Sequence, residues 1–126
     1  MILGTGVDIV EIKRIRQLRK KHGERFLRHC FTAREIAYCR QKKNADESFA
    51  ARFAAKEAVM KALGTGWSRG VGFTNIEVVK KPDEPPAALL HGKAAENQRQ
   101  RGISHFLLSL SHCKKYAVAQ AVAVSQ

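Results

Sequence analysis

The chain opens with an apolar stretch that favours a β-strand. Residues 2–10 read ILGTGVDIV, and the glycines at positions 4 and 6 would permit a bulge or the close approach of another element. From residue 11 to about residue 21, isoleucine and leucine recur with the spacing of one helical face, while most lysines and arginines fall off that stripe. The pattern therefore predicts a strand followed directly by an amphipathic helix.

Helical patterns continue after Gly23. A short helical piece is expected around residues 26–27, and the sequence TARE at 32–35 has the capping-box pattern that begins a helix, here one running to about residue 40. After a polar loop, Asp46 is the expected N-cap of a long, alanine-rich helix that ends at Leu63. These segments predict three helices in succession.

The second half of the chain mixes chain breakers with β-type patterns. A glycine-rich loop at 65–72 precedes a predicted strand at 73–80, and three prolines bar regular structure at 81–87. A helix is expected at 91–101. Alternating apolar residues then predict a β-hairpin, with strands at 105–111 and 116–124 and a turn at 113–115.

Together these elements predict a single α+β domain over residues 1–126, with an antiparallel sheet packed against helices. No apolar run approaches the length of about eighteen residues that a membrane span requires. The N-terminal sequence MILGTG has no basic leader, and the cysteines fit no zinc or redox spacing. We therefore expect a cytoplasmic protein with reduced thiols.

Positive charge is concentrated in the first third of the chain. The formal net charge is +12, and residues 13–43 hold twelve lysines and arginines against two glutamates, which gives this segment +10. A basic surface of this density attracts acidic partners and speeds their encounter. Nucleic acid, an anionic membrane and an acidic protein all fit the charge.

The long helix carries an unusual set of charges among small apolar residues. Glu57 and Lys61 are one turn apart, at the boundary between an aromatic arc and an alanine face. One interpretation is an ordinary ion pair, worth about a few tenths of a kcal/mol. The other is a carboxylate that holds a metal ion beside an ammonium that holds a phosphate. Lys56 falls on the apolar arc, and the pattern assigns it no role.

Asp8 supplies a possible second metal ligand at the end of the first strand. Mg²⁺ prefers oxygen ligands, and it usually binds through one or two carboxylates together with substrate phosphates and waters. Asp8 and Glu57 would make such a pair. Asp8 could instead cap the helix that follows the strand.

Three segments carry a resemblance to a known family: 6–12 (GVDIVEI), 52–58 (RFAAKEA) and 61–66 (KALGTG). In order, spacing and chain length they resemble the signatures of the holo-[acyl-carrier-protein] synthases, the short bacterial type of 4′-phosphopantetheinyl transferase. The LSH at 110–112 and the YAVA at 116–119 agree with this pattern. The resemblance covers nearly the whole chain and matches only loosely at 41–47 and 81–102.

The resemblance implies an Mg²⁺-dependent reaction, with Mn²⁺ as an alternative metal. Such enzymes move the 4′-phosphopantetheine arm of coenzyme A to a serine of apo-acyl carrier protein and release adenosine 3′,5′-bisphosphate. By position, Asp8 and Glu57 would bind the metal against the coenzyme's diphosphate, and Lys61 would contact phosphate. Glu57, directly or through a metal-bound water, would be the general base for the serine hydroxyl.

The resemblance also implies further contacts with coenzyme A. Arg52 would reach a phosphate, although a surface salt bridge is an equal alternative. Gly64 and Gly66 would let the backbone approach the nucleotide, although Gly64 is equally a plain helix C-cap. His112 would bind phosphate or merely sit on the hairpin.

Two partners are implied in the same way. Arg14 falls where the family meets its acidic carrier protein, in the middle of the basic segment, and the other basic residues are expected to form a solvated face. The resemblance implies a homotrimer with active sites between subunits and a carrier of fatty acid biosynthesis, with a polyketide carrier as the alternative.

A small nucleic-acid-binding module is the competing function. Its support is the charge of +12, because phosphate binding by lysine and arginine is a large part of such binding. The basic segment lacks exposed aromatic residues for base stacking, and no nucleic-acid-binding motif is present. We therefore expect no nucleic acid partner.

Overall fold

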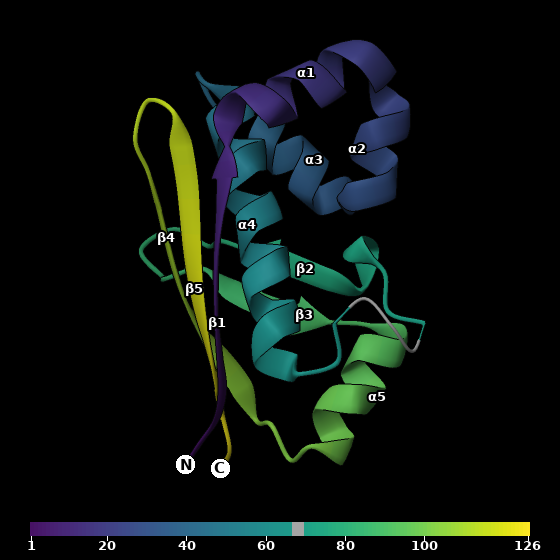
Figure 1. Ribbon diagram of the computed structural model, residues 1–126, viewed down its shortest axis with the longest axis vertical. Coiled ribbons are helices and arrows are strands. Elements are labelled where there is room, and N and C mark those ends of the chain that lie inside the picture. The colour runs from purple at the N-terminus through teal and green to yellow at the C-terminus, as the bar shows by residue number, and fades with distance from the viewer. Residues whose placement is uncertain (67–69) are drawn as a thin grey trace.

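The computed structural model describes residues 1–66 and 70–126, and it confirms the α+β class (Figure 1). The expected loop at 65–72 includes 67–69, which lie outside the described residues. Along the chain the elements are β1 (Ile2–Glu11), α1 (Ile12–His22), α2 (Glu24–Cys30), α3 (Ala33–Arg40), α4 (Ala45–Leu63), the 3₁₀ turn η1 (Phe73–Asn75), β2 (Ile76–Val79), β3 (Ala87–Leu90), α5 (Gly92–Gln100), β4 (His105–His112) and β5 (Tyr116–Val124).

The strands form two antiparallel sheets, and both sheets contact α4. The larger sheet has the order β1-β5-β4, and the smaller pairs β2 with β3. In Figure 1, α4 runs along the larger sheet, α1, α2 and α3 gather at one end of α4, and β2 and β3 pass behind α4, with α5 beside them. The two ends of the chain meet, because the Ser125 amide donates to the Met1 carbonyl at 2.9 Å.

Two glycines of β1 bring α4 unusually close to the larger sheet. A Cβ atom at Gly4 would collide with the carbonyl of Ala62, and one at Gly6 would collide with the carbonyl of Ala58. On the other side of this contact the helix presents buried alanines, which have little side chain to hold the backbones apart. The close approach expected from the glycines is confirmed, and it sets β1 against the C-terminal part of α4.

The N-cap of the long helix differs from the prediction. Asn44, not Asp46, precedes the first helical residue, and its side-chain oxygen accepts from the amide of Glu47 at 3.3 Å. Asp46 lies in the first turn, where its carboxylate binds Arg16 at 3.1 Å and Arg19 at 2.7 Å. Asp46 thus pairs with arginines of the basic helix α1, and the Asn44 side chain caps α4 in its place.

The smaller sheet was only half predicted. Its first strand begins at Ile76, because residues 73–75 form a 3₁₀ turn, and its second strand, at Ala87–Leu90, was missed. Four residues directly after the prolines show too little alternation to indicate a strand. The hairpin of β4 and β5 and the capping box of Thr32 with Glu35 are confirmed.

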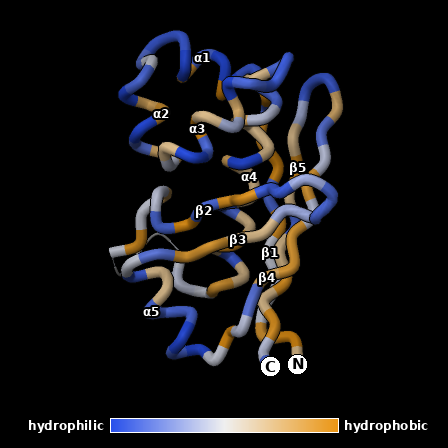
Figure 2. Tube along the Cα trace, turned by 180° about the vertical axis from the view of Figure 1, so that it is seen from behind, coloured by the Kyte–Doolittle hydropathy of each residue, from blue (hydrophilic) through white to orange (hydrophobic). Residues whose placement is uncertain are grey.

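The larger sheet leaves its outer face uncovered. Val7, Ile9, Leu107 and Tyr116 share that face through the strand pairing, and each is 44–63% exposed. Figure 2 shows the hydrophobic colour running along these strands. In the described part of the chain, no helix is long and apolar enough to cross a membrane.

Candidate active site

The structure brings Asp8 and Lys61 into contact. Asp8 lies on β1 in the same inward-facing set as Gly6 and Val10, and Lys61 lies on the last turns of α4. The Lys61 ammonium donates to the Val7 carbonyl at 2.9 Å and lies 3.4 Å from Asp8 Oδ1. The acid that pairs with Lys61 here is thus Asp8, which comes from a strand more than fifty residues earlier in the chain.

Asp8 and Glu57 line one cavity of about 510 Å³, which we call the carboxylate cavity. Its walls are mainly apolar and include the rings of Phe26, Phe53 and Phe73. Both carboxylates are partly exposed there, so they are accessible to a ligand. An apolar wall around two acids strengthens their attraction for any cation between them.

The donor set of this cavity fits Mg²⁺. Within the described residues, no group of three or more histidine, cysteine, aspartate or glutamate side chains could hold a metal ion by itself. Two carboxylates whose remaining ligands come from phosphate and water are the usual Mg²⁺ arrangement, whereas structural zinc sites are closed by four protein ligands. Asp8 and Glu57 could therefore hold the predicted metal together with a phosphorylated substrate.

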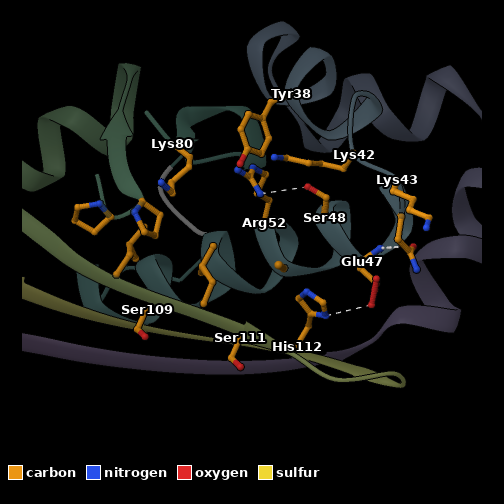
Figure 3. A pocket seen from close by; sticks show the side chains of 16 residues that line it. Tyr38, Lys42, Lys43, Glu47, Ser48, Arg52, Lys80, Ser109, Ser111 and His112 are labelled. Atoms are coloured by element: carbon orange, nitrogen blue, oxygen red, sulfur yellow. Dashed lines mark hydrogen bonds and ion pairs between the residues drawn. The ribbon is translucent and has the colours of Figure 1, made fainter. Parts of the chain in front are cut away.

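Arg52 and His112 line a different cavity, of about 1050 Å³, shown in Figure 3. We call it the cationic cavity, because its lining also includes Lys42, Lys43 and Lys80. It lies between α3, the first half of α4 and β4, and it shares no lining residue with the carboxylate cavity. Within one chain, Arg52 and His112 are thus separate from the predicted metal residues Asp8 and Glu57.

Arg52 is held by stacking rather than by a surface salt bridge. Its guanidinium lies 4.0 Å from the centre of the Tyr38 ring and donates to the Ser48 hydroxyl at 3.4 Å. The residue is 6% exposed, and its Nε is buried with no hydrogen-bond partner. The alternative of a surface salt bridge is therefore wrong. An unpartnered cationic donor beside a cavity is suited to an anion.

The cationic cavity also perturbs a tyrosine and pairs a histidine. Burial would raise the pKa of the Tyr38 hydroxyl, but Lys42 and Arg52 outweigh it and lower that pKa below its usual value. His112, at the end of β4, places Nδ1 3.1 Å from Glu47 Oε2 (Figure 3). The lowered pKa of Tyr38 indicates that Lys42 and Arg52 favour negative charge beside its hydroxyl.

Comparison with known proteins identifies the family of this chain. The family model described as the 4′-phosphopantetheinyl transferase superfamily matches residues 4–121. The chain belongs to this superfamily. The predicted resemblance and the transferase class are thereby confirmed.

The relatives of this phosphopantetheinyl transferase match it over nearly its whole length. The holo-[acyl-carrier-protein] synthase of Koribacter versatilis is 51% identical over 97% of this chain and 98% of that protein. The crystal structure of the synthase from Neisseria meningitidis has a TM-score of 0.90 at 36% identity, covering 99% of this chain and 100% of that one. The Helicobacter pylori synthase, solved in complex with coenzyme A, has a TM-score of 0.83 at 32% identity, covering 95% of this chain and 99% of that one.

Three predicted site residues remain, and of these only Arg14 lines one of the two cavities. Arg14 is exposed on α1 and lines the carboxylate cavity. Gly64 has φ 83° and is the C-cap of α4, which confirms the predicted helix cap. Gly66 has φ 61°. The Arg101 guanidinium donates to the Leu63 carbonyl and fixes the end of the helix beside them.

Sequence reasoning missed several residues of the cationic cavity. Lys42 and Lys43 entered only as part of the charge count, although Lys42 lies one turn after Tyr38 and its ammonium is 4.5 Å from the centre of that ring. Lys80 directly follows β2, whereas the sequence pattern predicts it as the last residue of a strand. An aromatic residue followed at helical spacing by lysine was the available signal.

Proposed function

We propose that this transferase moves the 4′-phosphopantetheine group of coenzyme A to a serine of apo-acyl carrier protein. The serine oxygen attacks the phosphorus of the phosphopantetheine group. The bond from that phosphorus to the bridging oxygen of the diphosphate breaks, and adenosine 3′,5′-bisphosphate leaves. The observation that carries the proposal is the pair of carboxylates, Asp8 and Glu57, in one cavity with the Lys61 ammonium at Asp8. The names of the close relatives support the same reaction.

The two carboxylates of this cavity and the neighbouring Lys61 would divide the chemistry between them. Asp8 and Glu57 would hold Mg²⁺, or Mn²⁺ in its place, and the bound metal offsets the negative charge of the diphosphate. Lys61 would turn its ammonium to a phosphate oxygen and stabilise charge as the bond breaks. Glu57 would accept the proton of the serine hydroxyl.

The cationic cavity would hold the nucleotide end of coenzyme A. Arg52 and His112 would donate to its phosphates, and the unpartnered Nε of Arg52 supports this role. Lysines 42, 43 and 80 surround the same space. Gly64 and Gly66 would let the backbone approach the coenzyme next to Lys61.

A site divided over two cavities would be completed by a second copy of the chain. The two cavities share no lining residue, and the outer face of the larger sheet is apolar and uncovered. Burying apolar surface of this kind drives association. We therefore propose a homotrimer in which Asp8 and Glu57 of one subunit face Arg52 and His112 of its neighbour.

Arg14 would guide the carrier protein to the carboxylate cavity. It lies on the cavity's rim, and the basic residues of α1 extend from it, so an acidic carrier would arrive with its serine close to Glu57. The carrier we propose is that of fatty acid biosynthesis in the cytoplasm.

The direct test combines purified transferase, apo-carrier, coenzyme A and Mg²⁺, and reads the mass of the carrier. The proposal predicts a gain of one phosphopantetheine group on serine. An unchanged carrier mass would refute it. Binding of an oligonucleotide that persists at physiological salt would support the nucleic-acid alternative instead.

A further inference from the structure

Lys56 is a buried cation in the residue directly before Glu57. Its side chain is 0% exposed, in the middle of a helix that otherwise buries alanine and aromatic residues on that face. A lysine is almost never fully buried unless it is paired. The proposed transfer reaction uses Glu57 and Lys61 and leaves Lys56 without a part.

Every proton of the Lys56 ammonium has an acceptor. Its Nζ lies 2.7 Å from Glu35 Oε1, donates to the Phe73 carbonyl at 3.0 Å and also donates to the Ile76 carbonyl. An ammonium has three donors, so the group is saturated. Two of these three contacts are to the backbone of the segment that leads from the 3₁₀ turn into β2.

The Glu35 carboxylate extends the same network. Oε1 also accepts from the Thr32 amide at 2.8 Å, which completes the capping box of α3, and Oε2 accepts from the Val78 amide at 2.7 Å. The side chain is 0% exposed. One buried ion pair therefore joins the start of α3 and the middle of α4 to the segment from Phe73 to Val78.

Stability alone does not account for this pair. Burial lowers the pKa of Lys56, and the nearby Glu35 carboxylate opposes that shift. Replacing a buried ion pair by apolar residues is often neutral or stabilising, because both charges lose their water. What an apolar pair could not reproduce is the fixed position of the two backbone carbonyls bound to the ammonium.

Phe73 connects these carbonyls to the proposed reaction. Its ring stacks on Phe53, with ring centres 5.1 Å apart, and it lines the carboxylate cavity with Asp8 and Glu57. The backbone of Phe73 is bound by Lys56 on one side while its side chain forms a wall of the cavity on the other.

We propose that Lys56 and Glu35 are positioning residues that hold Phe73 as a fixed wall of the carboxylate cavity. This inference rests on the proposed function, because the wall would direct the carrier serine toward Glu57. Small misplacements of this kind lower a rate strongly without loss of binding.

The test uses the paired variant Glu35→Gln/Lys56→Met. Lys56→Met alone would leave a buried carboxylate without its cation and is expected to unfold. Glutamine has a single carbonyl oxygen, so it can accept from the Thr32 amide of the capping box or from the Val78 amide, but it no longer carries a charge that needs a buried cation. In the folded paired variant, kcat for transfer should fall by about ten-fold or more. The Kd for coenzyme A should stay within about two-fold, because the cationic cavity does not contain Phe73.

The control is a matched pair on the surface. Lys93 and Glu96 lie 3.4 Å apart on α5, with both side chains about half exposed, and Lys93→Met/Glu96→Gln should leave kcat unchanged. A paired variant of Lys56 and Glu35 that is folded and has wild-type kcat would overturn the proposal.

Phe73→Leu shows whether the effect passes through the wall. If Lys56 acts by holding Phe73, adding Phe73→Leu to the Glu35→Gln/Lys56→Met variant should lower kcat little further. If Phe73→Leu lowered kcat by the same factor in the paired variant as in the wild type, this route would be contradicted.

Amide hydrogen exchange keeps the inference separate from the transfer reaction. The paired variant should exchange faster by about ten-fold or more across residues 73–78, whatever substrate the enzyme uses. Unchanged exchange would refute the positioning role even if transfer is observed. A wild-type enzyme that fails to modify the carrier would refute the proposed function alone.

Discussion

The pKa of the Glu77 carboxyl lies well below its usual value. The Arg34 guanidinium, 2.7 Å away, lowers the pKa of this carboxyl to about 2, with further hydrogen bonds from Thr32 and His91 and against the effect of burial. The carboxylate joins α3 to β2 next to the Glu35 network. Because the folded protein favours the charged form of this carboxyl, protonation in acid should weaken the junction between α3 and β2.

Stability should therefore depend on Glu77 in acid. Its folded pKa lies below its unfolded value near 4.5, so its contribution is complete above about pH 4.5 and is lost as the pH falls toward 2. We expect the difference in free energy of unfolding between wild type and Glu77→Gln to shrink by about 2 kcal/mol between pH 6 and pH 3. Urea unfolding at both pH values measures it. The exposed Glu84→Gln serves as a control, and a pH-independent difference for Glu77→Gln would contradict the assignment.

His112 should contribute to coenzyme binding. It lines the cationic cavity and is half exposed, so removing its ring leaves the core intact. We expect His112→Ala to weaken coenzyme A binding about ten-fold, through the loss of one hydrogen bond to a charged phosphate. Calorimetric titration gives the Kd. His105→Ala, on the same strand but outside that cavity, should bind normally; equal Kd values for the two variants would remove His112 from the site.

At the scale of single residues, the sequence predicted the acids Asp8 and Glu57 but not the partner of the buried Lys56. Asp8, Glu57 and Lys61 were found because their spacing matches a family signature. The contact of Lys56 with Glu35 could not be predicted, since it joins two helices whose packing no local pattern specifies. The same holds for the contact of Asp46 with Arg16 and Arg19 of α1, which replaces the predicted capping role of Asp46.

At the scale of elements, the contact between β1 and α4 aligns the two carboxylates. Gly6→Ala should shift this contact, because the new Cβ would meet the Ala58 carbonyl. We expect a loss of about 1–3 kcal/mol in the free energy of unfolding and a marked loss of transfer activity, measured by urea unfolding and carrier mass. Gly72→Ala is the control, since its φ is −116° and the nearest atom to its Cβ is an ordinary 3.7 Å away. Equal stability of the two variants would contradict the account.

Most elements could be predicted because their signals are local. The helix faces, the capping box at Thr32 and the alternation of β4 and β5 all lie within a few residues of one another. The strand at Ala87–Leu90 is recognisable only by its partner, β2, since four residues after a proline pair carry little pattern of their own. The separation of Arg52 from the carboxylate cavity likewise depends on tertiary packing.

At the scale of the whole molecule, the uncovered sheet face should determine assembly. Leu107→Lys places a charge on that face, where Leu107 is 56% exposed, and we expect it to convert the proposed trimer to monomer. Light scattering on a sizing column measures the mass in solution. Gln100→Lys adds the same charge on polar α5 and should leave the mass unchanged. A trimeric Leu107→Lys, or a monomeric wild type, would contradict the proposed interface.

The central claim is that Asp8 and Glu57 act together in the transfer of phosphopantetheine. The most direct measurement is the mass of apo-carrier after incubation with coenzyme A, Mg²⁺ and either wild type, Asp8→Asn or Glu57→Gln. The account predicts one added phosphopantetheine group with wild type, and none with either variant although both stay folded and bind coenzyme A. A wild-type enzyme that leaves the carrier unmodified, or variants that modify it at the wild-type rate, would contradict the account.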